Sequence, residues 1–136
     1  MTNRKQALEA LRDQVKAGVK YETMGHTIMC QKAFPKPDDF DGSREAYANS
    51  SAQLAILVWR NDDLNATKAL HDAVLPGWHF NVATEANMQG FYATASPKQW
   101  GNSFVACSET PARAWLLAIL EALISETPDT PKGETP

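Results

Sequence analysis

The sequence predicts an α+β fold in which a three-stranded antiparallel meander is layered with helices, in the order α-α-(α)-α-β-β-β-α. Three observations lead to this class. Apolar residues recur at helical spacing in the first part of the chain, the period changes to two over 78–108, and a long apolar helix follows. Helices before and after a compact meander are typical of an α+β layered domain.

The length and composition indicate a single domain. The chain has 136 residues, 43% of them hydrophobic, and no shift in composition divides it. A chain of this size can bury one core, so we expect one domain over 1–125. Residues 126–136 alternate proline, threonine and charge without an apolar side chain that could order them. We expect this segment to be a disordered tail.

An amphipathic helix is expected at the beginning of the chain. Ala7, Leu8, Leu11 and Val15 recur at helical spacing and would form one stripe on the surface of such a helix. Gly18 follows the stripe and can end the helix. We therefore expect the chain to begin with one helix whose apolar stripe faces the core.

The segment that follows is less regular. Residues 21–34 are expected to form a shorter helix with Met24, Ile28 and Cys30 on one side, and the proline-rich stretch after it is expected to be a loop. Residues 43–60 begin polar and end in "LAILVW", which fits either the end of a buried helix or a short buried strand. We favour the helix.

The central helix has the clearest pattern. Its sequence, "NDDLNATKALHDAVLPG", spans 61–77 and carries apolar residues at helical spacing. Asp62 or Asp63 can cap its start, because a carboxylate oxygen accepts hydrogen bonds from the exposed amides of the first turn. Pro76 and Gly77 are expected to end it.

Three short strands are expected after the central helix. The segments 78–85, 90–96 and 103–108 alternate apolar and polar residues, which is the period of a strand. The links between them are short enough to join antiparallel neighbours in a meander. Phe80 and Phe91 occupy alternating positions on these strands and are expected to pack mainly in the core.

The last helix, expected over 111–125, has a strong start signal. Thr110 can cap it, and Pro111 suits the first helical position because its missing amide is not needed there. The helix is apolar on nearly all sides. We therefore expect it to be buried between the sheet and another helix or another subunit.

Arg113 lies in the first turn of this last helix, where the exposed amides already carry roughly half a positive charge. A cation is unfavourable there unless something anionic meets it. In one interpretation Arg113 binds a phosphate together with the backbone amides that follow Thr110, including that of Ala112. In the other, Arg113 pairs with Glu109 or with an acid of another subunit.

Arg60 is a second candidate cation for this site. It ends an apolar run and lies close to a pair of acids, Asp62 and Asp63. An ordinary surface pairing with those acids is the simpler interpretation. If the protein is oligomeric, Arg60 of a neighbouring chain could instead assist the phosphate site.

Aromatic residues near the meander could hold a ring of the ligand. Trp100 lies in the polar loop "PKQWGN", where it either folds back on the core or stacks on a base or another chain. Phe91 and Tyr92 are alternatives for packing a base. Asn102 could read a base edge, although holding the turn is the simpler role for it.

Several function classes are not expected. The formal charge of −3 and the pI near 5.5, with scattered lysines and arginines, argue against a nucleic-acid binder. The spacing of His26, Cys30 and Cys107 matches no metal site, so we expect no metal and no cofactor. None of the motifs GxGxxG, GxxxxGK[ST], HExxH or GxSxG is present, and we expect no catalytic residues. Without an apolar run of membrane length or a signal peptide, we expect a cytoplasmic protein with reduced thiols and no membrane partner.

The stretches "DLNATKALHDAVLPGWHF", "GFYATASP" and "SETPARAWLLAILEALI" resemble the phage ABA-sandwich domain family. That family runs from a short N-terminal helix through an "-LDAA-AL" helix, a "LPGW" turn and a small meander to a "-TP-RALLLAIL-AL" helix. The resemblance covers residues 62–125 well and the N-terminal third in outline, and 43–60 departs from the short loop that the family pattern has there.

The resemblance implies a phage protein without enzymatic activity. Some small phage proteins of this architecture, the sponges that counter the Thoeris defence, sequester cyclic ADP-ribose isomers or cyclic oligonucleotides made by host immune enzymes. By this resemblance we expect a homo-oligomer in the host cytoplasm that captures a small nucleotide-like signal. The alternatives are a protein-interaction module that binds a host or phage protein, and an enzyme that degrades such a nucleotide.

Overall fold

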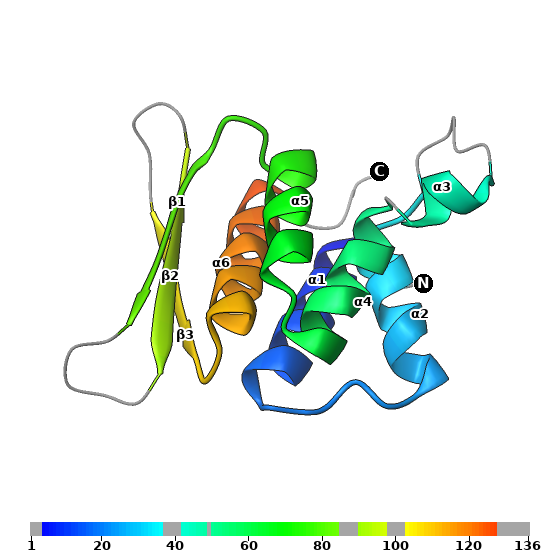
Figure 1. The fold of residues 1–136 in the computed structure, drawn as a ribbon, viewed down its shortest axis with the longest axis horizontal. Helices are drawn as coiled ribbons and strands as arrows, with labels where there is room; N and C mark the ends of the chain where they lie inside the picture. Colours follow the sequence, from blue (N-terminus) through cyan, green and yellow to red (C-terminus); the bar gives the residue numbers. More distant parts are fainter. Residues whose placement is uncertain (1–3, 37–41, 49, 85–89, 98–102, 128–136) are drawn as a thin grey trace, which may run out of the picture.

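The computed structural model describes residues 4–36, 42–48, 50–84, 90–97 and 103–127. The described residues form six helices and one antiparallel sheet of order β1-β2-β3 (Figure 1), which confirms the predicted α+β class and the meander. The helices are α1 (Arg4–Lys16), α2 (Met24–Ala33), α3 (Arg44–Ala48), α4 (Ser51–Asn61), α5 (Leu64–Val74) and α6 (Pro111–Glu126). The strands are β1 (His79–Thr84), β2 (Phe91–Ser96) and β3 (Phe104–Ser108).

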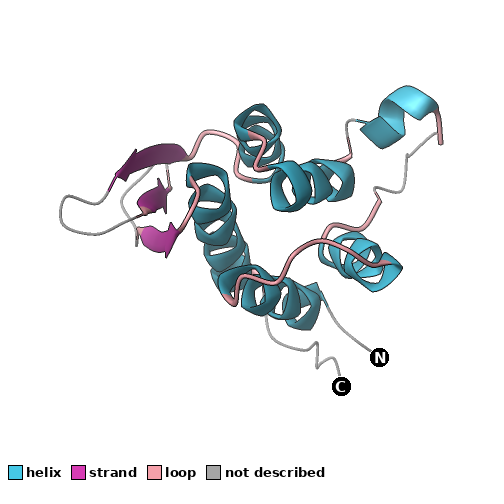
Figure 2. Cartoon of the chain, turned by 60° about the horizontal axis from the view of Figure 1, so that its bottom comes forward, coloured by secondary structure: helices cyan, strands magenta, loops and turns pink. Residues whose placement is uncertain are grey.

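Helix α6 is the central layer of the molecule. It packs against all three strands on one side and against α1, α4 and α5 on the other, and Figures 1 and 2 show the described helices on one side of the sheet. Its buried residues run from Ala112 to Ile124 and are interrupted only by Arg113 and Glu121. The predicted burial between the sheet and other helices is confirmed, and helices of the same chain provide it.

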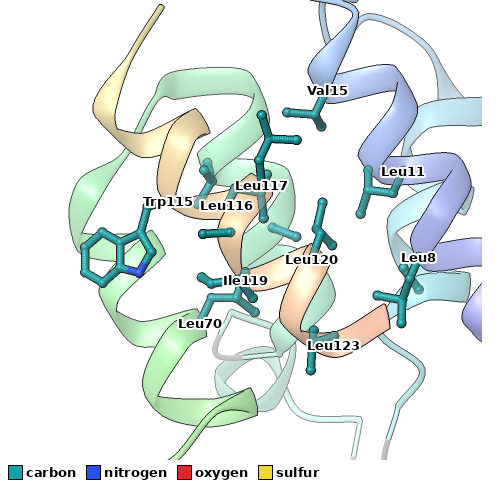
Figure 3. Close-up of a cluster of buried hydrophobic side chains, with 14 of the residues drawn as sticks. Leu8, Leu11, Val15, Leu70, Trp115, Leu116, Leu117, Ile119, Leu120 and Leu123 are labelled. Atoms are coloured by element: carbon teal, nitrogen blue, oxygen red, sulfur yellow. The ribbon is translucent and has the colours of Figure 1, made fainter. Parts of the chain in front are cut away.

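The core forms where α6 meets the other helices. Leu8 and Leu11 of α1 and Leu70 of α5 are fully buried against the aliphatic side chains of α6 (Figure 3). Burying one such side chain contributes about 1.5–3 kcal/mol relative to leaving it exposed. These contacts fix α5 and α6 relative to each other, and that arrangement positions the site described below.

Residues 43–60 are helical, as favoured, but they form two helices and not one. Helix α3 is short, and Ser50 begins α4 by accepting a hydrogen bond from the amide of Gln53 over 3.2 Å. Asp62 ends α4 in the left-handed region, with φ of 53°. Short polar residues such as aspartate tolerate that conformation, and it allows α5 to begin two residues later.

The apolar side predicted for the second helix is wrong in its detail. Met24 is 72% exposed and Ile28 is 44% exposed, whereas Cys30 is fully buried together with Ala33. Residues two apart on a helix point to different sides, so Ile28 and Cys30 do not share a face. The side of α2 that carries Cys30 and Ala33 packs in the core, and α2 contacts α1 and α4, whereas Met24 and Ile28 face outward.

The sheet has one face toward α6 and one face away from it. In the register of the sheet, Phe80 pairs with Ala95 and Val82 with Ala93, so these four side chains share a face. Ala93 and Ala95 are fully buried, which identifies this face as the one that packs on α6. The small alanine side chains allow the helix to approach the sheet closely.

Candidate functional site

A groove of about 520 Å³ lies between strand β1 and helix α5. We call it the β1–α5 groove. The start of α6 forms its floor. It is lined by Leu64 of α5, by Phe80, Asn81, Val82, Ala83 and Thr84 of β1, by Phe91 of β2, and by Pro111 and Trp115 of α6.

The groove exists because α5 and β1 run in opposite directions and separate after a tight turn (Figure 1). The amide of Trp78 donates to the carbonyl oxygen of Leu75 over 3.0 Å, and Gly77 takes a φ of 81° that glycine adopts without strain. The start of α5 and the end of β1 therefore lie at the same end of the groove, where Leu64 and Thr84 both line it.

Three rings at the other end of the groove are held in fixed positions. The rings of Phe80 and Trp115 are stacked, with centroids 4.4 Å apart and an interplanar angle of 22°. The ring of His71 meets Phe80 edge-on at 5.1 Å. Phe80 nevertheless remains 41% exposed, so part of its ring faces the groove. Its expected core role is therefore only partly realised.

The outer edge of β1 has no strand beside it within the described residues. β1 is the first strand in the order β1-β2-β3 and pairs only with β2. Its sequence, "HFNVAT", contains no lysine, acid or proline, which are the residues that commonly protect an edge strand from pairing with another chain. The groove runs along this edge, because five consecutive residues of β1 line it.

Charged side chains lie beside the ends of the groove, while none of its lining residues is charged. At the Phe80 end, the ammonium group of Lys68 lies 5.7 Å from the centroid of the Phe80 ring and pairs with Asp72. At the other end, Asp63 caps α5 through a 3.0 Å hydrogen bond from the amide of Ala66. Asp63 directly precedes Leu64, so a carboxylate is adjacent to that end of the groove.

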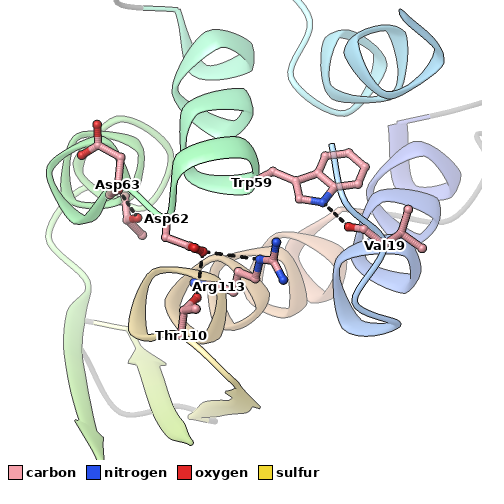
Figure 4. A network of polar contacts seen from close by, with 7 residues as sticks. Val19, Trp59, Asp62, Asp63, Thr110 and Arg113 are labelled. Carbon is pink, nitrogen blue, oxygen red and sulfur yellow. Dashed lines mark hydrogen bonds and ion pairs between the residues drawn. The ribbon is translucent and has the colours of Figure 1, made fainter. Parts of the chain in front are cut away.

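Arg113 faces a carboxylate of its own chain (Figure 4). Its Nε lies 3.4 Å from Oδ1 of Asp62, and the same oxygen accepts a 2.9 Å hydrogen bond from the hydroxyl of Thr110. The Thr110 hydroxyl oxygen in turn accepts from the amide of Arg113 over 3.2 Å. Nε makes an ion pair but no hydrogen bond of acceptable geometry. Asp62 is thus the anion that meets this cation, whereas the sequence had led us to expect a phosphate, Glu109 or an acid of another subunit.

Arg113 does not line the β1–α5 groove. Pro111 and Trp115, which form the floor, are four residues apart and share a face of α6, whereas Arg113 lies midway between them and points to another side. Arg60 is exposed, with its guanidinium 6.0 Å from the centroid of the Tyr21 ring, and does not line the groove either. The structure therefore does not bring the two predicted cations to this groove.

The remaining predicted site residues are divided between several places. Phe91 lines the groove, and Thr110 caps α6 beside it. Ala112 is fully buried, and Tyr92 alternates with Phe91 along β2 and so points to the sheet face that α6 does not cover. Trp100 and Asn102 lie outside the described residues.

Leu64 and Trp115 line the groove but were not among the predicted site residues, and neither was His71, which does not line the groove but contacts Trp115. His71 holds Trp115 in place: its Nδ1 accepts a 3.2 Å hydrogen bond from the indole, and its Nε2 lies 3.0 Å from the carbonyl oxygen of Trp78. Because Nδ1 acts as an acceptor, this network assigns the proton of the neutral ring to Nε2. The signal in the sequence was the spacing of Pro111 and Trp115, which places an aromatic ring one turn after the helix start.

A second cavity of about 380 Å³ lies between α2 and α4 and is more polar in character. Within the described ranges, no group of three histidine, cysteine, aspartate or glutamate side chains is arranged to hold a metal ion. None of the helices described here combines the length and the apolar character that a membrane span needs.

Comparisons of the chain with protein-family models, with curated proteins and with solved structures found no match.

Proposed function

We propose that the protein is a non-enzymatic binding protein that holds a segment of another polypeptide in the β1–α5 groove. One observation carries this proposal: an apolar groove follows the edge of β1, which no strand of the described residues covers, and it has exposed apolar side chains at both ends. Leu64 is 44% exposed at one end and Phe80 is 41% exposed at the other. Exposed apolar surface gathered in a groove is typical of a binding site.

The charges near the groove favour a polypeptide over a phosphate-bearing ligand. A buried or half-buried phosphate needs a cation or several amides to replace its hydration. Arg113 faces Asp62, and the amide of residue 113 is already bonded to the Thr110 hydroxyl. Asp63 adds a further carboxylate beside Leu64. An uncharged or cationic group suits this end better than an anion.

Capture of a nucleotide-derived immune signal, such as a cyclic ADP-ribose isomer or a cyclic oligonucleotide, is the second candidate. The stacked rings of Phe80 and Trp115 and the nearby Phe91 favour it, because stacking one base on an aromatic side chain is worth about 1–3 kcal/mol. The groove volume also falls within the range of about 300–1,000 Å³ that is usual for small-molecule sites. The proposed phage origin, homo-oligomeric state and host-cytoplasmic location belong to this candidate.

Binding measurements on matched variants test the two candidates. Decapeptides selected from a random displayed library and a panel of cyclic ADP-ribose isomers and cyclic di- and trinucleotides are each titrated calorimetrically. We expect selected peptides to bind and Leu64→Lys to abolish their binding. Met24→Lys, which also replaces an exposed apolar side chain but lies on α2, serves as the control and is expected to leave binding unchanged.

Each outcome decides between the candidates. Nucleotide binding that Leu64→Lys weakens, with no peptide binding, would replace the first candidate by the second. Binding of neither class more tightly than about 1 mM, near 4 kcal/mol, would remove both. Mass spectrometry of material released from the purified protein by heating tests the enzyme alternative. An altered nucleotide would indicate turnover, and an unchanged nucleotide would indicate capture.

A further inference from the structure

We infer that the partner segment binds in an extended conformation and adds a fourth strand to the outer edge of β1. This inference rests on the proposed function and names the form of its ligand. The segment places every second side chain in the β1–α5 groove, and a basic residue of the segment lies at the groove end beside Asp63.

The backbone of β1 supplies the first part of the argument. In an antiparallel ladder, alternate residues direct their amide and carbonyl groups toward one neighbour, and the residues between them direct theirs to the opposite side. β1 has six residues and pairs with β2 alone, so the outward groups of alternate residues have no strand partner among the described residues. An extended chain satisfies such groups in a row, as in other cases of strand addition.

The shape of the groove supplies the second part. A strand added to β1 runs about 4.8 Å beyond it, on the side of α5. Side chains on the α6 side of that strand point toward Phe80, Val82 and Trp115, all of which line the groove. Side chains on the opposite side point away from the groove. The groove therefore selects apolar residues with a period of two, and the other positions of the segment are unrestricted.

The charges at the groove ends supply the third part. Asp62 and Asp63 lie at the end where α5 and α6 begin, and the exposed Glu109 directly precedes Thr110 there. Arg113 neutralises only one of these three carboxylates. A basic residue of the segment complements the remaining negative charge.

A second copy of this chain fits this description less well. Pairing of β1 with β1 of another copy would satisfy the same backbone groups, but the strand sequence "HFNVAT" offers no lysine or arginine to the acidic end. The partner that the charges select is a different polypeptide, with apolar residues at alternate positions and a lysine or arginine at one end. Dimerisation through β1 is one outcome of the test.

The experiment uses the full chain and decapeptides selected from a random displayed library. The tightest selected peptide is resynthesised as a series in which one backbone nitrogen at a time is methylated, and each peptide is titrated by fluorescence anisotropy. Methylation removes a backbone donor without removing a side chain. We expect losses of at least about tenfold at alternate positions and little change between them, because only every second amide faces β1.

Two variants test the charge arrangement without disturbing the fold. Asp63→Asn removes the charge but preserves the helix cap, because asparagine caps a helix about as well as aspartate. Glu109→Gln removes the charge of an exposed side chain and preserves its size. Each is expected to weaken the selected peptides about two- to fivefold, and Asp72→Asn at the other end is expected not to weaken them. Selected sequences should also share the period of two and the terminal basic residue.

The remaining outcomes separate this inference from the proposed function. Strand addition would be overturned by a methylation series with uniform losses, or by selected peptides without a period of two. If Leu64→Lys still abolished binding in that case, the proposed function would stand, because the partner would still bind in the groove. Selection that yields no groove-dependent peptide would overturn both. Sedimentation that shows a stable dimer broken by Leu64→Lys, but not by Met24→Lys, would assign the edge to a second copy and overturn the inference.

Discussion

The indole of Trp115 donates a hydrogen bond to Nδ1 of His71 over 3.2 Å, in a pair whose members lie on α6 and α5. His71 is 1% exposed and also contacts the carbonyl oxygen of Trp78 through Nε2. This chain of contacts ties the floor of the groove to the turn before β1. His71 and Trp115 are buried and Trp78 is partly buried, so the loss of the His71 ring leaves its two partners without these hydrogen bonds.

Replacing His71 by leucine tests the contribution of its contacts with Trp115 and Trp78 to stability. His71→Leu introduces an apolar side chain of comparable size and leaves the indole N–H of Trp115 and the carbonyl oxygen of Trp78 without their His71 partner. We expect the free energy of unfolding to fall by about 1–3 kcal/mol, measured by urea denaturation. The control is His79→Leu on the exposed surface of β1, which should change stability by less than about 0.5 kcal/mol. Equal effects of the two substitutions would contradict the structural role of His71.

The two faces of β2 give a matched pair of substitutions. Ala93 is fully buried against α6, and its neighbour Thr94 points to the opposite face. Ala93→Leu inserts extra volume where the helix lies close to the sheet and should cost about 1–3 kcal/mol. Thr94→Leu should stay within about 0.5 kcal/mol of the parent protein. Thermal or urea unfolding measures both, and the reverse order would mean that the faces are wrongly assigned.

A double-mutant cycle tests the pairing of Arg113 with Asp62. Arg113→Met keeps an unbranched apolar stem but removes the guanidinium group, and Asp62→Asn keeps a residue that tolerates the left-handed conformation. Because Asp62 is 42% exposed, we expect a coupling free energy of only about 0.5–1 kcal/mol that decreases with added salt. A coupling near zero at low salt would mean that Arg113 is available for another anion.

The two thiols are expected to differ in reactivity. Cys30 is fully buried, and burial raises the pKa of its thiol to about 12, whereas Cys107 is exposed on β3. Thiolates are the reactive form. At pH 8 we expect a thiol-specific reagent to modify one cysteine of the folded protein and both in urea. Modification of two cysteines in the folded state would contradict the burial of Cys30.

The same thiol makes stability depend on pH. The ordinary pKa of a cysteine is 9.0, and in the folded protein that of Cys30 is about 12, so above pH 9 the unfolded chain releases a proton that the folded chain keeps. Ionisation then favours the unfolded state, and stability falls as pH rises. Between pH 8 and pH 10 the parent protein should lose about 1 kcal/mol more than Cys30→Ala, measured by urea unfolding at each pH. Parallel pH profiles for the two proteins would contradict this.

The sequence predicted the fold class well because its signals are local. The caps at Thr110 and Asp63 and the alternation in the meander depend on neighbouring residues, and the structure contains each of them. The division of 43–60 into two helices was missed because the break at Ser50 lies within a polar stretch without glycine or proline. The predicted end of the last helix was one residue short, because Glu126 belongs to α6.

The candidate site was harder to predict because it depends on contacts between distant segments. Arg113 was recognised as an unusual cation, but its partner Asp62 is brought to it by the turn between α4 and α5, which local pattern does not encode. Glu121 is a parallel case. It is the other charged residue within the buried stretch of α6, and it pairs with Arg12 of α1 over 3.1 Å. Both charges within the buried stretch of α6 are therefore matched by neighbouring elements of the chain.

The groove was missed for a related reason. Leu64 and Thr84 are separated by the whole of α5 and the turn after it, and they meet only because β1 runs back along that helix. A single exposed leucine at a helix start is not informative by itself. Leu64 indicates a binding site only in combination with the edge of β1 beside it.

Chemical-shift mapping of the ¹⁵N-labelled protein with the tightest selected decapeptide tests the central claim most directly. A nucleotide panel is titrated in parallel. With the peptide, we predict that shifts concentrate on Leu64, on the amides of β1 and on the indole N–H of Trp115. Shifts confined to Val105 and Cys107 on the other sheet face, or to Thr27 and Gln53 in the second cavity, would contradict the assignment of the β1–α5 groove as the binding site.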